Sequence, residues 1–228
     1  MDIQIDKIQV VLFGVDKMLA KKFISENHPN GYLDYLYSEP EIEGKVPLVF
    51  YIHGAGGRGD DLEILRNNSA LAKVLGFNKD KCVVVAPQCH WNYWFTGFEI
   101  LSDFIDTIRR SEKVDISRVY ICGSSMGGYT TWQLCLSHTQ WFAAAVPICG
   151  GGMYWAASSL KSLPIWAFHG ALDTTVLPEE TIHMVKAINA NGGDARITIF
   201  PKVGHDAWTP ALSDPKTWEW VWAQKKEL

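Results

Sequence analysis

Residues 119–128 of this chain read Val119-Tyr120-Ile121-Cys122-Gly123-Ser124-Ser125-Met126-Gly127-Gly128. An apolar run ends in a glycine-rich turn that carries two serines, and residues 129–137 then continue with a helical pattern. This order predicts a strand, a sharp turn and a helix, with one serine hydroxyl exposed at the apex of the turn. Because a serine hydroxyl is a weak nucleophile by itself, a fold that directs it toward a base is what makes it reactive.

The glycine spacing selects which serine lies at the apex. Side chains two positions before and two positions after the apex would collide with the strand or the helix, so glycine is favoured at both. If Ser125 is at the apex, both positions are glycine, namely Gly123 and Gly127. The neighbouring serine would instead be flanked by a cysteine and a methionine. We therefore expect Ser125 to be the nucleophile.

A second glycine-rich loop follows the apolar strand pattern of residues 47–52 and reads His53-Gly54-Ala55-Gly56-Gly57. Backbone N–H groups in such a loop can bind the negative oxygen that forms during acyl transfer, which needs two donors. We expect these donors to be the N–H groups of Ala55 and of Met126, the residue after the nucleophile. The loop lacks the Gly-Lys-Ser/Thr ending of a P-loop, and no acidic ribose ligand is evident, so no nucleotide or other cofactor is predicted.

Two later strand patterns lead into an acid and a base. Residues 163–168 are followed by Asp173, and residues 195–201 are followed by His205. The resulting chain order of serine, aspartate and histidine is that of one known triad architecture. In this interpretation His205 takes the proton from Ser125, and Asp173 holds the imidazole in the required tautomer.

The chain contains seven histidines, so other bases must be weighed. His90 is the main rival, because it lies in an aromatic loop after a strand. Asp206 adjoins His205 in sequence, so its side chain should point elsewhere. The remaining histidines sit beside glycines at strand ends, in helices or in a polar loop, where a structural role is the simpler interpretation: His28, His53, His138, His169 and His183.

These motifs, taken in order, resemble those of the α/β-hydrolase superfamily. The matching stretches are residues 53–57, 123–128, 169–176 and 204–205. The closest likeness is to compact serine esterases of the phospholipase/carboxylesterase and dienelactone-hydrolase-like groups. This resemblance implies a carboxylic ester hydrolase with an acyl-serine intermediate. Dienelactone hydrolases themselves carry cysteine at the apex, so the serine here does not imply their reaction.

Other functions remain open on the same motifs. Relatives of prolyl oligopeptidase share the histidine-glycine elements, so a small serine peptidase or amidase is one alternative. An acyltransferase is another, and a third is a non-catalytic binding protein that retains the fold. We expect the partner to be a small ester, with short-chain or aryl acyl groups.

The chain alternates strand patterns with amphipathic helices. Helical patterns cover residues 99–112 and 178–190, and a last helix is expected to begin at Asp214-Pro215. Because the strands are almost entirely apolar, we predict an α/β fold with a mainly parallel central sheet and helices on both faces. The length of 228 residues fits one domain over residues 1–228.

The N-terminal part is less regular. Residues 31–39 alternate in the manner of an edge strand, residues 3–11 could form a strand, and residues 15–23 could form a short helix or irregular structure. Between the strands ending near Cys149 and starting near Pro164 there are only about 14 residues. A sizeable lid does not fit there, so we expect an open site and no activity on long-chain fats.

Residues 87–95 form an aromatic loop after the strand pattern of residues 82–86. This loop should lie at the carboxyl edge of the sheet, where ligands bind in such folds. We expect Trp91 and Trp94, together with Trp208, to line the substrate pocket. The alternative is that the aromatic side chains of the loop only cover the core.

Composition argues against several classes of partner and predicts a reducing, cytoplasmic environment. The net charge is −4 and adjacent basic residues occur only in pairs, so no nucleic acid is expected. No apolar stretch approaches about 20 residues, so no membrane span is expected. The five cysteines show no metal-ligand spacing. Four of them fit buried residues of a reducing, cytoplasmic protein, whereas Cys89 is expected to be partly exposed in a loop. The first residues show no signal-peptide pattern, and the oligomeric state is not predicted.

Overall fold

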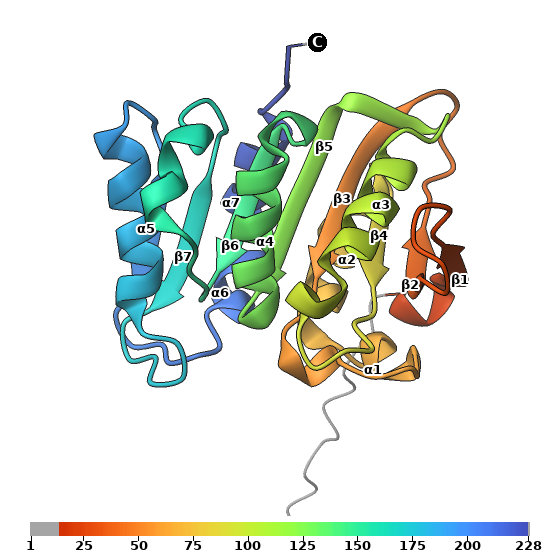
Figure 1. Ribbon diagram of the computed structural model, residues 1–228, viewed down its shortest axis with the longest axis horizontal. Coiled ribbons are helices and arrows are strands. Elements are labelled where there is room, and N and C mark those ends of the chain that lie inside the picture. Colours follow the sequence, from red (N-terminus) through yellow and green to blue (C-terminus); the bar gives the residue numbers. More distant parts are fainter. Residues whose placement is uncertain (1–13, 228) are drawn as a thin grey trace, which may run out of the picture.

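The computed structural model describes residues 14–227 and is built on one mixed sheet of eight strands (Figure 1). The strand order is β1-β2-β4-β3-β5-β6-β7-β8. The pairs β1–β2 and β2–β4 are antiparallel, and all other neighbours are parallel. The strands are β1 Leu19–Ile24, β2 Tyr32–Ser38, β3 Val46–Ile52, β4 Val83–Pro87, β5 Val114–Ser124, β6 Ala144–Ile148, β7 Trp166–Gly170 and β8 Arg196–Phe200.

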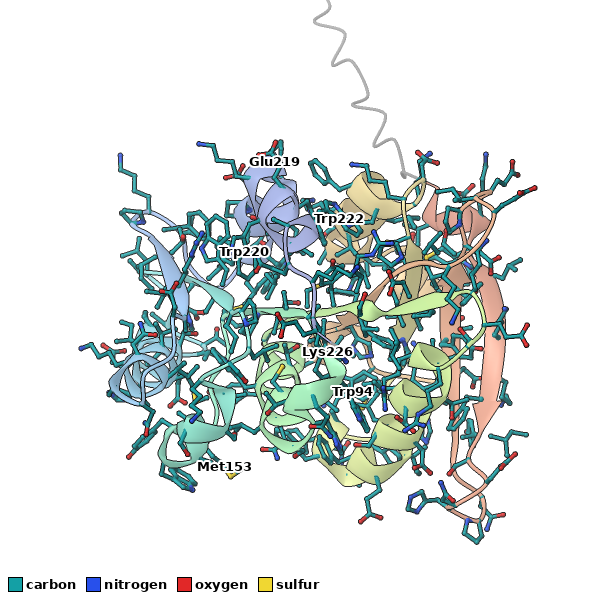
Figure 2. The ribbon with its side chains drawn as sticks, turned by 90° about the horizontal axis from the view of Figure 1, so that it is seen from above. Trp94, Met153, Glu219, Trp220, Trp222 and Lys226 are labelled. Atoms are coloured by element: carbon teal, nitrogen blue, oxygen red, sulfur yellow. The ribbon has the colours of Figure 1, made fainter. Side chains whose placement is uncertain are left out.

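Helices cover both faces of the sheet, which confirms the predicted α/β architecture. In Figure 1, α3, α4 and α5 lie in front of the sheet, and α2, α6 and α7 lie behind it. Figure 2 separates the same two layers, with Trp220 and Trp222 of α7 on one side and Met153 on the other. The helices are α1 Glu63–Arg66, α2 Ser69–Asn78, α3 Phe98–Arg109, α4 Met126–Ser137, α5 Pro178–Ala190, α6 Trp208–Ser213 and α7 Pro215–Trp222.

Short 3₁₀ helices occur in the connections: η1 Val15–Lys17, η2 Ala55–Gly57, η3 Trp94–Gly97, η4 Thr139–Trp141 and η5 Tyr154–Leu160. Only η5 interrupts the segment between β6 and β7, in agreement with the expected lack of a sizeable lid. None of the helices in residues 14–227 combines the length and the apolar character needed to cross a membrane.

The two helix layers create two cores, and the central strands contribute to both. Every residue of β3 is buried. Leu48, Phe50 and Ile52 pack into the core beneath α3, α4 and α5, whereas Val49 and Tyr51 pack into the core beneath α2, α6 and α7. Successive side chains of a strand point to opposite faces, so a strand that is covered on both sides has to be apolar throughout.

Three N-terminal expectations need comment. The strand predicted over residues 31–39 exists as β2, but it is not an edge strand, because β1 pairs outside it. Residues 15–23 do not form a helix beyond η1 and instead enter β1. Most of β1 is exposed, so its sequence carries no burial period that could have indicated the strand. The strand proposed at residues 3–11 lies outside the described residues.

Candidate active site

The turn between β5 and α4 holds Ser125 in a conformation that is rare for a side chain other than glycine. Its backbone angles are φ 56° and ψ −119°. The N–H of Ser125 donates to the carbonyl of Ile148, the last residue of β6, at 3.0 Å. A Cβ on Gly123 would lie 2.4 Å from the carbonyl oxygen of Gly127. A Cβ on Gly127 would lie 1.9 Å from that of Ile52. The backbone packs so closely on either side of Ser125 that only glycine fits at these two positions, as expected from the sequence.

Three polar side chains meet in front of this turn. The Nε2 atom of His205 lies 2.9 Å from Ser125 Oγ, and its Nδ1 atom lies 2.7 Å from Asp173 Oδ2. Asp173 belongs to the loop after β7 and His205 to the loop after β8. Parallel strands bring their carboxyl ends to one edge of the sheet, the lower edge in Figure 1, and so unite residues that are far apart in the chain.

The environment of Asp173 keeps its carboxyl group ionised. Burial raises the pKa of Asp173, but the hydrogen bonds from His205 and from the N–H groups of Val176 and Thr175 outweigh this effect and leave the pKa below its ordinary value. The two N–H groups donate to Oδ1 at 2.9 and 3.0 Å, so Oδ2 is free to accept the Nδ1–H of His205. The lone pair on Nε2 then faces the serine hydroxyl, which is an arrangement able to accept its proton.

The two expected oxyanion donors both lie at the start of a helix. Ala55 is the first residue of η2 and Met126 the first residue of α4. First-turn N–H groups have no acceptor within their own helix, and among residues 14–227 neither N–H donates to another backbone carbonyl. Ala55 lines the same pocket as Ser125, and Arg58 fixes its carbonyl through a 2.9 Å hydrogen bond. Both N–H groups thus remain available for a ligand oxygen.

A pocket of about 410 Å³ opens beside Ser125 and His205. Ala55, Ala70 and Trp208 supply apolar wall, and among the described lining residues there is no lysine, arginine, aspartate or glutamate.

Three of the polar residues that line the pocket, Tyr51, Asn68 and Ser124, were not predicted to lie there. The hydroxyl group of Tyr51 donates to Asn68 Oδ1 at 3.2 Å and lies 3.3 Å from Ser124 Oγ. Tyr51 occurs in an apolar strand pattern that predicts a core residue, and Ser124 was weighed only as the alternative nucleophile of the turn. The available signal was their shared face, because β3 and β5 pair in parallel with Tyr51 opposite Cys122, two residues before Ser124.

The aromatic residues expected to line the pocket divide into two groups. Trp208 does line it, with its ring edge-on to that of His205 at a centroid distance of 5.4 Å. Trp94 was wrongly assigned, because it is fully buried between α3 and α4 and donates its Nε1–H to the carbonyl of His53 at 3.1 Å (Figure 2). Trp91 also lies outside the pocket lining and packs against the ring of His90 at 3.9 Å.

This difference predicts opposite phenotypes for two tryptophan variants. Trp94→Ala removes a fully buried side chain, so we expect a loss of about 3–5 kcal/mol in the free energy of unfolding, measured with urea. Trp208→Ala should instead lower kcat/KM for a short ester by roughly tenfold through lost contact area, with a smaller loss of stability. A Trp94→Ala protein as stable as the wild type, or unchanged kinetics in Trp208→Ala, would contradict these roles.

The two histidines in the loops after β3 and β4, His53 and His90, have structural roles. His53 is buried, with Nδ1 donating to the carbonyl of Gly54 at 2.6 Å and Nε2 accepting the N–H of Cys89 at 2.9 Å. His53 thereby joins the two loops that follow β3 and β4. Cys89 is fully buried rather than partly exposed as expected. His90 stacks on Tyr32 at 4.7 Å and is no longer a rival base, since His205 occupies the position beside Ser125.

The burial of His53 predicts an acid-sensitive fold. Burial lowers the pKa of His53 from 6.5 to about 4. Between these two values the unfolded chain binds more protons than the folded one, so stability rises with pH across this window. The free energy of unfolding is unaffected by protonation of His53 above about pH 6.5, where the ring is neutral in both states. It falls by roughly 3 kcal/mol as the pH drops from 6.5 to below 4. Urea unfolding at several pH values should show this slope, and His53→Asn should flatten it. An equal slope in the variant would exclude His53 as its source.

One group of three side chains has atom types that can bind a metal. Cys149, Asp173 and His205 each place such an atom within 4.8 Å of the others, and this is the one such group within residues 14–227. Burial raises the pKa of the Cys149 thiol to about 12, so it stays protonated, whereas metals bind the thiolate. The carboxylate and imidazole are already hydrogen-bonded to each other. The donor set fits an acid–base pair rather than a metal centre.

Known proteins similar to this chain are hydrolases. Residues 87–227 match the model of the dienelactone hydrolase family. A thermostable esterase of known structure superposes with a TM-score of 0.83 and 30% sequence identity, over 93% of this chain and 64% of that chain. This superposition confirms the expected α/β-hydrolase fold.

Two curated proteins are similar over part of their length. A bifunctional acetylxylan esterase/xylanase of Neocallimastix patriciarum is 26% identical over 145 residues, which are 61% of this chain and 21% of that protein. Poly(3-hydroxyalkanoate) depolymerase C of Paucimonas lemoignei is 29% identical over 137 residues, which are 53% of this chain and 31% of that protein. The matched regions thus span about a fifth to a third of these relatives.

Proposed function

Because this chain belongs to the dienelactone hydrolase family, we propose that it is a carboxylic ester hydrolase with a catalytic triad of Ser125, His205 and Asp173. The observation that carries the proposal is the continuous hydrogen-bonded chain from Ser125 Oγ through the imidazole of His205 to the buried carboxylate of Asp173, with distances of 2.9 and 2.7 Å. A reactive serine needs such a base and such an orienting acid.

In the proposed acylation step, Ser125 Oγ attacks the ester carbonyl carbon while His205 Nε2 takes the hydroxyl proton. The carbonyl oxygen becomes an oxyanion, which the N–H groups of Ala55 and Met126 stabilise by about 3 kcal/mol each. His205 then gives its proton to the departing alcohol, and the acyl group stays on Ser125. Asp173 stabilises the imidazolium throughout without taking its proton.

In the deacylation step, water takes the place of the alcohol. His205 removes a proton from the water, the hydroxide attacks the acyl carbon, and the proton returns to Ser125 as the acid leaves. Catalysis requires an unprotonated imidazole, so kcat/KM should fall as acid protonates the base.

The pocket supports small, neutral acyl or aryl groups as substrates. About 410 Å³ holds a short chain or one aromatic ring, and the apolar wall of Trp208 and Ala70 suits either. A carboxylate on the substrate would lose water without gaining a cationic partner. The name of one relative, an acetylxylan esterase/xylanase, also favours a short acyl group.

The proposal is tested by combining covalent labelling with a substrate panel. A fluorophosphonate should label the chain once, at Ser125, and abolish hydrolysis of p-nitrophenyl acetate and butyrate. Matched p-nitroanilides should react far more slowly. Faster anilide cleavage would instead identify an amidase, transfer to added alcohol an acyltransferase, and a folded protein without labelling or turnover a binding protein.

A further inference from the structure

The buried carboxylate of Asp173 lies between two histidines. Its Oδ2 atom accepts the Nδ1–H of His205 at 2.7 Å and lies 3.2 Å from Nε2 of His169. The side chains of His169 and Asp173 are both fully buried. The proposed triad uses only His205, so the second contact needs its own explanation.

Every partner of His169 on its Nε2 side is an acceptor. Nε2 lies 2.9 Å from the carbonyl oxygen of Val176, in addition to the carboxylate of Asp173. On the other side of the ring, Nδ1 lies 2.7 Å from Thr181 Oγ1. The same hydroxyl lies 2.7 Å from the carbonyl oxygen of Gly150. Thr181 is fully buried, so no bulk water compensates a missing proton here.

Counting protons over these contacts shows that each neutral form of the ring leaves buried acceptors facing one another. If only Nε2 is protonated, Nδ1 must accept the single hydroxyl proton of Thr181. The hydroxyl oxygen and the carbonyl of Gly150 then face each other at 2.7 Å with no proton between them. If only Nδ1 is protonated, the lone pair of Nε2 faces the carbonyl of Val176 and the carboxylate of Asp173. Each form therefore leaves buried acceptors in contact.

We propose that His169 carries a proton on both ring nitrogens and acts as a fixed cation that positions the carboxylate of Asp173. Nδ1–H then donates to Thr181 Oγ1, whose own proton goes to Gly150, and Nε2–H donates to Val176 while the positive ring faces Asp173 Oδ2 at 3.2 Å. Each of these hydrogen bonds then pairs a donor with an acceptor. His169 is thus a positioning residue, and this role rests on the proposed triad.

The consequence for catalysis follows from the charges. Three donors hold the carboxylate, namely the N–H groups of Thr175 and Val176 on Oδ1 and the imidazole of His205 on Oδ2. The ring of His169 adds a charge contact with Oδ2 at 3.2 Å. A cation next to Asp173 offsets part of its negative potential at His205. Removing that cation should make protonation of His205 easier, which disables the base at a higher pH than in the wild type.

Within residues 14–227, no lysine or arginine forms an ion pair with Asp173 that could replace this cation. Cys149 lies within 4.8 Å of Asp173 and His205, and its thiol is neutral. Glu180 on α5 faces Gly151, and Asp206 follows His205, so both are anions that would only favour protonation of the base. The shift expected on losing His169 therefore has a definite sign.

His169→Gln and His169→Leu separate the loss of the charge from the loss of all polar contacts. A glutamine amide can still donate to Val176 without charge and presents its oxygen to Thr181, whereas leucine offers neither group. We expect His169→Gln to stay within about threefold of the wild-type kcat/KM above pH 8. Its acid limb should move up by about one pH unit, so on that limb the variant should be roughly tenfold less active than the wild type. His169→Leu should lose activity at every pH. An acid limb in His169→Gln that coincides with the wild type would overturn the proposal.

A second measurement does not depend on catalysis or on the stability of the leucine variant. In protein labelled with ¹⁵N-histidine, both ring nitrogens of His169 should carry protons at pH 7.5, with the signals assigned by their absence in His169→Gln. An unprotonated ring nitrogen would overturn the proposal. If the wild type hydrolyses no ester and Ser125 resists labelling, the proposed function fails, while the NMR spectrum still decides the protonation of His169.

Discussion

Ser125→Ala is expected to lower kcat for hydrolysis of a short p-nitrophenyl ester by a factor on the order of 10⁶. Without the hydroxyl group no acyl-enzyme can form. His205 and the two backbone donors could then assist only a direct attack by water, so a residual acceleration of about 10³–10⁴ over the uncatalysed rate should remain. The measurement is steady-state kinetics on purified protein, supported by a circular dichroism spectrum that matches the wild type.

Ser124→Ala is the matched control, because the two serines are adjacent and differ by only one position in the turn. Ser124 is buried and its hydroxyl faces Tyr51, away from His205. We expect Ser124→Ala to lose no more than about tenfold in kcat/KM through the altered pocket. Equal activity in Ser125→Ala and the wild type would remove Ser125 from the mechanism, and a large loss confined to Ser124→Ala would exchange the two assignments.

The positions of the proposed triad could be predicted because the strand topology alone brings the three residues to the same edge of the sheet. Ser125, Asp173 and His205 each follow the carboxyl end of a parallel strand, and the ends of such strands share one edge of the sheet. Strand patterns and glycine spacing are local signals that a sequence displays directly. No long-range packing needs to be known to expect these three residues at the same edge.

The pocket wall could not be predicted in the same way. An aromatic loop at the correct edge can point its rings into the site or into the core, and only the packing of α3 and α4 makes Trp94 a core residue. Similarly, the sequence pattern predicts only a structural role for His169, which lies beside a glycine at a strand end. Its contact with Asp173 arises because the loop after β7 turns back to present its carboxylate. Such features depend on three-dimensional packing rather than on sequence period.

Among glycine-to-alanine substitutions in the turn, Gly127→Ala is expected to be the most destabilising. The added Cβ would lie 1.9 Å from the carbonyl oxygen of Ile52 and 2.7 Å from that of His53, and real Cβ atoms do not approach backbone so closely. Relief requires α4 to move away from β3. We expect a loss of more than about 3 kcal/mol in the free energy of unfolding, or failure to fold.

Gly56→Ala distinguishes this steric effect from a general cost of replacing glycine near the site. A Cβ on Gly56 meets nothing within 4 Å, so the free energy of unfolding should change by no more than about 1 kcal/mol in either direction. Urea unfolding of both variants makes the comparison. Movement of α4 would also shift Ser125 at its N-terminus relative to His205, so any folded Gly127→Ala protein should react slowly with a fluorophosphonate. A Gly127→Ala protein with wild-type stability and labelling rate would show that the strand and helix are not in the close contact on which the geometry of the serine turn depends.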